Sequence, residues 1–261
     1  MSKKFLISRQ RHLLLTFLII LIISALLAVT IGSFKISVFD ILLGKLDELG
    51  STILYTIRMP RVMLAAFVGA SLAISGACLQ GLFRNPLADP GLIGVSAGAA
   101  LGAAFAIVFS SRFISLDFLV PYLIPFSAII GSASVIIILF VITKGFGYDG
   151  VTYMLLAGIA VNAIAGVGIG VLTYISDDSE LRSLTFWTMG SFGGVTWPLI
   201  MPAILVIIFS IVWIIGLSRK LDLIQLGDVE ASRLGINIKK VRFGVIISSA
   251  VVVGISAVSY T

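Results

Sequence analysis

The chain has 261 residues, of which 59% are hydrophobic and 11% charged, and its mean hydropathy is +1.17. A soluble globular domain carries roughly 25% charged residues, so this composition excludes a soluble domain and predicts a membrane protein. The one cysteine, Cys78, excludes an intrachain disulfide, and the one histidine, His12, excludes a histidine-based metal site or proton relay.

The hydrophobic residues gather in long runs. A run of about 20 apolar residues is long enough to cross the hydrocarbon core of a bilayer. The first run follows basic residues and is longer than the core of a signal peptide, which has about 7–15 residues, so we predict a retained span. The chain therefore predicts a single all-α polytopic membrane domain over residues 1–261, with spans at about residues 13–31, 62–82, 91–110, 119–143, 151–175, 198–217 and 243–261.

The basic residues predict the orientation of these spans. If the N-terminus is cytoplasmic, twelve of the 18 Lys and Arg residues lie on the inner side and six on the outer side. This distribution obeys the positive-inside rule. The net charge of +6 is therefore interpreted as a sign of membrane orientation, with the lipid bilayer and not a nucleic acid as partner.

The segment Arg58-Met-Pro-Arg61 opens the second span from the outer side. Two arginines at this place oppose the orientation bias. They either anchor the start of the helix at the interface or bind carboxylates of an external partner, because a guanidinium presents a fork that matches a carboxylate.

The segment from Arg84 to Gly98 places two prolines, an Arg, an Asn and an Asp between two apolar runs. Non-helical backbone at membrane depth is tolerated only where protein or a water-filled cavity covers it. The segment is either a short surface loop whose prolines end one helix and start the next, or a gating element of a transporter.

Glycines recur at every fourth position inside two predicted spans. They are Gly94, Gly98 and Gly102 in one span, and Gly166 and Gly170 in another. Small residues at this spacing let helix backbones approach closely, so we expect a tightly packed bundle.

The acidic segment at residues 177–182 predicts a turn on the outer side, and the glycines at 190–194 predict a bent, non-helical approach to the next span. Phe186 and Trp187 either belong to an aromatic belt at the interface or line an outer vestibule for a planar ligand. Met189 lies nearby in the sequence.

The inner loop at residues 218–242 contains a second candidate element. A short helix is predicted between Gly227 and Gly235, because acidic residues suit its start, and Arg233 and a following glycine suit its end. An isolated helix of this length is marginal in water, so it either rests on its own bundle or docks against a partner.

Motifs of catalysis are missing from the sequence. The Gly44-Lys45 pair lacks the upstream glycine of a phosphate-binding loop. We therefore predict that the chain is not an enzyme and that energy for active transport comes from another chain or an ion gradient. An ion-coupled transporter would need intramembrane carboxylates that face a cavity, which the spans lack.

Five motifs in order resemble the FecCD-type permeases, which are the membrane subunits of ATP-driven importers for iron-siderophores, haem and vitamin B12. The resemblance extends from about residue 13 to the end. The motifs are Arg58-Met-Pro-Arg61, Gly76-Ala-Cys-Leu-Gln-Gly81, Arg84-Asn-Pro-Leu-Ala-Asp-Pro-Gly91, Thr185-Phe-Trp-Thr-Met-Gly190 and Leu226-Gly-Asp-Val-Glu-Ala231.

The resemblance implies a role for particular residues. Arg58 and Arg61 would dock a periplasmic substrate-binding protein. Asn85 and Leu87 would form part of a cytoplasmic gate, and residues 144–149 the other part. Phe186, Trp187 and Met189 are kept as possible lining of the pathway. The helix that would couple to the ATPase contains Gly227, Asp228, Glu230, Arg233 and Leu234.

The resemblance also implies partners and a location. Permeases of this kind form homodimers above two cytoplasmic ATPase subunits, in the bacterial cytoplasmic (inner) membrane. ATP and Mg²⁺ would be bound by the ATPase, and no cofactor or metal by this chain.

Two motifs look most like the haem-importing branch: Asp89-Pro-Gly-Leu-Ile-Gly-Val-Ser96 and Thr185 to Gly190. We therefore expect haem as the substrate, with a ferric siderophore or vitamin B12 as the alternative. Such permeases have ten spans, in which spans two to five recur in inverted orientation. Residues 241–261 faintly echo residues 62–80 and then end, so we expect that about seven spans are present and the C-terminal spans are missing. A truncated membrane scaffold without transport is the remaining alternative.

Overall fold

The computed structural model describes residues 3–113, 120–143 and 150–259, and every regular element in these ranges is helical. The helices in chain order are α1 (Lys3–Thr30), α2 (Val38–Leu42), α3 (Glu48–Thr52), the π-helix η1 (Ile53–Arg58), α4 (Met59–Phe83), the 3₁₀ helix η2 (Pro90–Ile93), α5 (Val95–Phe113), α6 (Val120–Thr143), α7 (Gly150–Ile175), α8 (Asp178–Met189), α9 (Trp197–Gln225), α10 (Asp228–Arg233) and α11 (Ile238–Ser259).

Several of these helices have the dimensions of membrane spans. Within the described residues, five helical segments are long and apolar enough to cross a bilayer: Arg11–Thr30, Glu48–Phe83, Leu123–Ile142, Tyr153–Ile175 and Trp197–Gln225. A shorter apolar helix covers Val95–Phe109. The all-α, polytopic fold class expected from the apolar runs is thus confirmed.

The contacts divide the chain into two compact units, residues 1–63 with 194–198, and residues 64–193 with 199–261. In the first unit, the side chain of Arg58 donates hydrogen bonds to the carbonyl oxygens of Val29 (2.7 Å), Thr30 (3.0 Å) and Phe34. These carbonyls lie at and just after the C-terminal end of α1, where a helix leaves acceptors unpaired. Arg58 therefore holds the end of α1.

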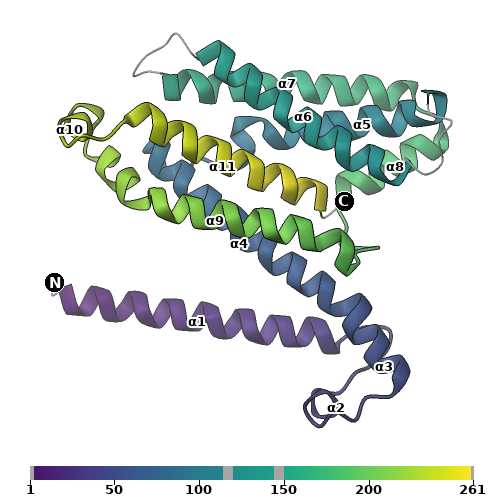
Figure 1. The fold of residues 1–261 in the computed structure, drawn as a ribbon. Helices are drawn as coiled ribbons and strands as arrows, with labels where there is room; N and C mark the ends of the chain where they lie inside the picture. Colours follow the sequence, from purple (N-terminus) through teal and green to yellow (C-terminus); the bar gives the residue numbers. More distant parts are fainter. Residues whose placement is uncertain (1–2, 114–119, 144–149, 260–261) are drawn as a thin grey trace. The chain divides into compact units, whose positions relative to one another are not determined.

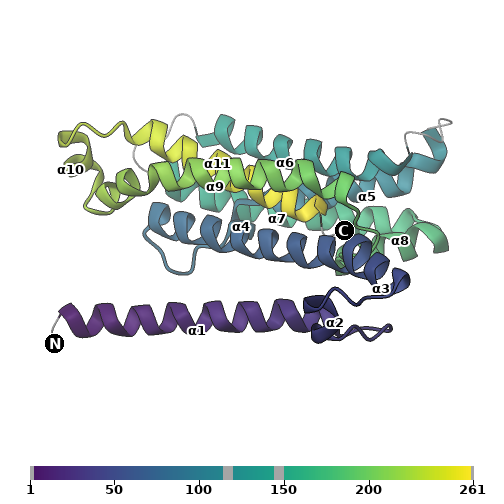
Figure 2. The ribbon, with the colours of Figure 1, turned by 60° about the horizontal axis from the view of Figure 1, so that its bottom comes forward.

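The second unit contains the main hydrophobic core. Figures 1 and 2 show α5, α6 and α7 side by side, with α11 along α5 and α6. Buried side chains from eight elements meet there, among them Leu79, Ile93, Leu139, Ile224 and Val245. Burying residues of this size contributes about 1.5–3 kcal/mol each in water. Between lipid-embedded helices, close packing takes over part of that role.

Glycines bring α5 and α6 into backbone contact. A Cβ atom on Gly98 would lie 2.7 Å from the carbonyl oxygen of Gly131, and a Cβ on Gly102 would overlap the backbone of Ser127. The packing role expected of Gly98 and Gly102 is therefore confirmed. For Gly166 and Gly170 it is wrong within this chain, because a Cβ on either would meet no described atom within 4 Å.

Candidate functional site

The loop after α4 leaves the helix at Arg84, whose φ of +50° lies in the left-handed region. Pro86 lacks a backbone donor, and the residue before a proline avoids the helical conformation. The side chain of Asn85 accepts a hydrogen bond from the Leu87 amide at 2.9 Å, which closes a tight turn. Leu87 stands out from this turn and is 82% exposed.

The loop returns to the bundle through η2. Asp89 accepts a hydrogen bond from the Gly91 amide at 2.7 Å and Pro90 follows at the first helical position. Gly94, with a φ of +83°, ends η2 directly before α5. The segment is therefore a broken element between two helices and not a continuous span from residue 91.

Helix α7 is bound to this broken element by two kinds of contact. Asn162 donates a hydrogen bond from Nδ2 to the carbonyl oxygen of Gly91 at 3.0 Å. Four residues earlier, a Cβ on Gly158 would lie 3.0 Å from Ile93 Cα and still closer to the Leu92 carbonyl oxygen. The non-helical backbone of η2 is thus covered by protein, as the low dielectric of a membrane requires.

The short helix expected in the inner loop is present as α10, between Gly227 (φ +121°) and Gly235 (φ +79°). Its Ala231 is buried in the main core, which fixes one side of the helix. The other side is exposed and carries Val229, Glu230 and Arg233, and the C-cap residue Leu234 is also exposed. An ion pair of 2.9 Å joins Glu230 and Arg233. This helix presents both apolar and charged groups outward.

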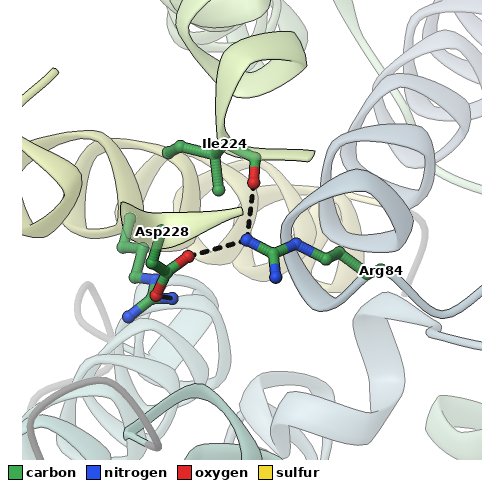
Figure 3. Close-up of polar contacts among 4 residues, drawn as sticks. Arg84, Ile224 and Asp228 are labelled. Carbon is green, nitrogen blue, oxygen red and sulfur yellow. Dashed lines mark hydrogen bonds and ion pairs between the residues drawn. The ribbon is translucent and has the colours of Figure 1, made fainter. Parts of the chain in front are cut away.

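An ionic cluster joins the loop to α10 (Figure 3). One carboxylate oxygen of Asp228 accepts from Arg84 Nη2 at 2.7 Å, and the other accepts from Arg242 Nη2 at 2.5 Å. The same Nη2 atom of Arg84 donates to the carbonyl oxygen of Ile224 at 2.5 Å. Sequence reasoning missed Arg84 and Arg242 as partners of Asp228, and no local signal could have revealed them, since they are 144 and 14 residues away.

The two outer arginines have different surroundings. Arg58 is half-buried and its guanidinium is bonded to the carbonyls at the end of α1, whereas Arg61 is exposed. Only the exposed guanidinium presents its fork to an external carboxylate without breaking those bonds. The docking assignment of both residues stays a prediction, and the geometry favours Arg61.

The acidic segment after α7 starts a helix, so the expectation of a turn at residues 177–182 is wrong. Asp177 caps α8, accepting from the Glu180 amide at 2.8 Å, while Glu180 accepts from the Asp177 amide at 3.1 Å. The spacing Asp-x-x-Glu is a capping box, and this local signal could have predicted the helix. The chain leaves α8 at Gly190, with a φ of +72°.

The three candidate pathway residues lie on α8 and do not share one environment. Trp187 packs partly buried against the core of α5 and α7, in contact with the cluster that includes Ala104 and Leu172. Phe186 and Met189 are exposed, and their spacing of three places them on one face of the helix. Their role as pathway lining stays a prediction.

The second part of the expected gate, residues 144–149, lies outside the described residues. In the part of the chain that the structure describes, no three His, Cys, Asp or Glu side chains form a group that could hold a metal ion.

A family model, two curated relatives and a solved structure each match nearly the whole chain, and all of them are transport proteins. A model of the FecCD transport family matches residues 18–260. The hemin transport system permease protein HmuU of Yersinia pestis is 40% identical over 94% of this chain and 73% of its own length. The vitamin B12 import system permease protein BtuC of Vibrio vulnificus is 33% identical, over 94% and 71%. A solved structure, described as an inward-facing conformation of a transporter assigned to the metal-chelate ABC type, matches with a TM-score of 0.81 at 30% identity, over 95% of this chain and 76% of that one.

Proposed function

This chain belongs to the FecCD transport family of ABC importer permeases, and we propose that haem is the cargo that it conducts across the bacterial cytoplasmic membrane. It is a multi-pass membrane protein with the permease fold. The proposal extends to its partners. A second copy of the chain would complete the pathway, two cytoplasmic ATPase subunits would supply the energy, and a periplasmic binding protein would deliver the cargo.

The choice of haem rests on a difference in sequence identity. The chain is 40% identical to the hemin permease and 33% identical to the vitamin B12 permease, over the same share of its length. Because both alignments cover 94% of the chain, the difference is not caused by a missing segment. The lone histidine, His12, lies in the N-terminal tail, so haem would pass the spans without histidine ligands.

The geometry supports a gate and a docking helix at the end of the spans where the loop and α10 lie. Leu87 stands exposed on a turn that Asn85 closes, which suits residues that meet the same turn of a second copy across the pathway. Two exposed apolar residues, Val229 on α10 and Leu234 directly after it, suit a groove in a partner protein. An exposed short helix gains its stability from such a contact.

At the start of α4, the exposed Arg61 supports docking of the binding protein. The proposal assigns carboxylates of that protein to its guanidinium, since paired charges of this kind steer association and fix orientation. Phe186 and Met189 on α8 offer apolar, polarizable surface for a planar cargo.

The test is stimulation of ATP hydrolysis by cargo. The permease is purified with its ATPase, placed in lipid nanodiscs and mixed with binding protein loaded with haem, a ferric siderophore or vitamin B12. We expect that haem-loaded protein stimulates hydrolysis most and that empty protein does not. Stronger stimulation by siderophore or vitamin B12 would contradict haem as the cargo, and no stimulation by any of them would favour the inert scaffold.

A further inference from the structure

Three segments that are distant in the sequence meet at one carboxylate. Asp228, the first residue of α10, contacts Arg84 in the loop at 2.7 Å and Arg242 in α11 at 2.5 Å. Each arginine binds a different oxygen of the carboxylate. The loop and α11 are thus both attached to the helix that would seat in the ATPase (Figure 3).

The cluster differs from an ordinary surface ion pair. The side chains of Asp228 and Arg242 are only 14% and 16% exposed, and that of Arg84 is 43% exposed. Exposed pairs contribute little because water screens them, whereas charge-assisted hydrogen bonds in a sheltered site are short and directional. By contrast, the pair between Glu230 and Arg233 on the same helix is exposed at both ends.

Arg84 is also fixed independently of Asp228. Its Nη2 atom donates to the carbonyl oxygen of Ile224, in the last turn of α9. The last four carbonyls of a helix have no partner within the helix and carry a partial negative charge, so a cation is favourable there. The guanidinium therefore bridges the end of α9 and the start of α10, on either side of Gly227.

Arg84 occupies the position at which α4 ends and the loop begins. Its left-handed backbone conformation costs a non-glycine residue energy, so surrounding contacts must hold it. Asn85 bonds to the Leu87 amide inside the loop and Leu87 points outward, so neither side chain ties the loop to α10 in this geometry. Asp228 restrains the loop from the side of α10 through its contact with Arg84.

We propose that Arg84 is a positioning residue that links the gate loop to the ATPase-docking helix through Asp228, so that a displacement of α10 displaces Asn85 and Leu87. The inference rests on the proposed function, because it assigns a transmission path between two elements of that machinery. Arg84 itself touches neither cargo nor ATPase in this scheme.

The experiment compares three altered permeases in complex with the ATPase. Arg84→Asn removes the guanidinium and keeps a residue type that tolerates the left-handed conformation. Asp228→Asn removes the acceptor charge at nearly constant shape, and a third permease carries both changes. Lys239→Gln is the matched control, since it removes an exposed positive charge from α11, three residues before Arg242.

The readouts are the affinity for the ATPase, basal ATP hydrolysis, and cargo transported per ATP hydrolysed. For Arg84→Asn we expect unchanged ATPase affinity and basal hydrolysis. The amount of cargo transported per ATP should fall at least about fivefold, which is the smallest effect typical of coupling between two sites. The double variant should be no worse than either single variant, because residues of one linkage do not contribute additively. Arg84→Lys should restore part of the loss, and Lys239→Gln should match the wild type.

Other outcomes separate the inference from the function. If the wild type transports with cargo-stimulated hydrolysis and Arg84→Asn does the same, the linkage is refuted while the function stands. Additive losses in the double variant, or loss of ATPase affinity in Arg84→Asn, would likewise overturn the linkage and leave the pair with a structural role only. If the wild type neither binds the ATPase nor responds to any cargo, the proposed function itself fails, and the linkage with it.

Discussion

Replacing Gly158 by alanine should separate α7 from η2. A Cβ on Gly158 would lie 3.0 Å from Ile93 Cα and still closer to the Leu92 carbonyl oxygen. Because a carbon atom and a carbonyl oxygen normally stay about 3.3–3.6 Å apart, the two backbones must move apart by about 1 Å. The neighbouring hydrogen bond from Asn162 to the Gly91 carbonyl, 3.0 Å long, would then be stretched beyond its working range.

The expected cost follows from three contributions. Overpacking of this kind costs about 1–3 kcal/mol, and loss of the hydrogen bond costs about 1 kcal/mol. Alanine offsets about 1 kcal/mol of this, because it is the better helix former. The net destabilisation of about 2 kcal/mol corresponds to an apparent Tm lower by about 6 °C for a chain of this size.

The assay is thermal unfolding of the purified permease in detergent at one heating rate, because such unfolding is irreversible and its midpoint depends on the rate. The control is Gly166→Ala on the same helix, where a Cβ meets no described atom within 4 Å. This variant keeps the gain in helix propensity and should melt about 3 °C higher than the wild type. If both variants melt at the same temperature, the close contact between α7 and η2 is refuted.

Four further predictions concern single side chains. Arg61→Gln should weaken the affinity of the binding protein at least about fivefold without changing the Tm, and a loss of stability instead would point to a structural role. Arg58→Gln should lower the Tm, since the carbonyls of Val29, Thr30 and Phe34 lose a charged donor at a cost of about 1–3 kcal/mol; an unchanged Tm would contradict those bonds. Asp177→Ala should cost about 1 kcal/mol by removing the cap of α8, and faster amide exchange confined to the first turn of that helix is the sign to look for. Asn162→Ala should lower stability by about 1 kcal/mol, but by little when Gly158→Ala is already present, because that change has broken the same bond; full additivity would speak against the shared contact.

Much of the architecture follows from local patterns in the sequence. Long apolar runs predict helices at membrane depth because a bilayer leaves backbone groups no other partner. The break between Arg84 and Gly94 is equally local, since Pro86 and Pro90 cannot continue a helix and Gly94 adopts a positive φ. The short helix between Gly227 and Gly235 is likewise predicted by residues next to it in the sequence.

Other features were present in the pattern but were given the wrong interpretation. The capping box at Asp177 and Glu180 predicts the start of a helix, yet the density of acidic residues favoured a turn. Glycines at a spacing of four look alike on every helix. Gly98 faces the backbone of α6, whereas Gly166 faces no described atom, and only the arrangement of helices distinguishes them.

The sequence by itself determined that this chain is a bundle of membrane helices with a polar break between α4 and α5 and a short helix before α11. Hydrophobic run length, proline and glycine act within a few residues, so no distant partner is needed to predict their effect. The tertiary structure alone decided which groups the charged residues meet: Arg58 turns back to the end of α1, while Arg84 meets Asp228, 144 residues away. Burying a charge costs free energy unless an opposite charge or a hydrogen-bonding group lies beside it. Which group lies there depends on how the packed helices bring distant segments together.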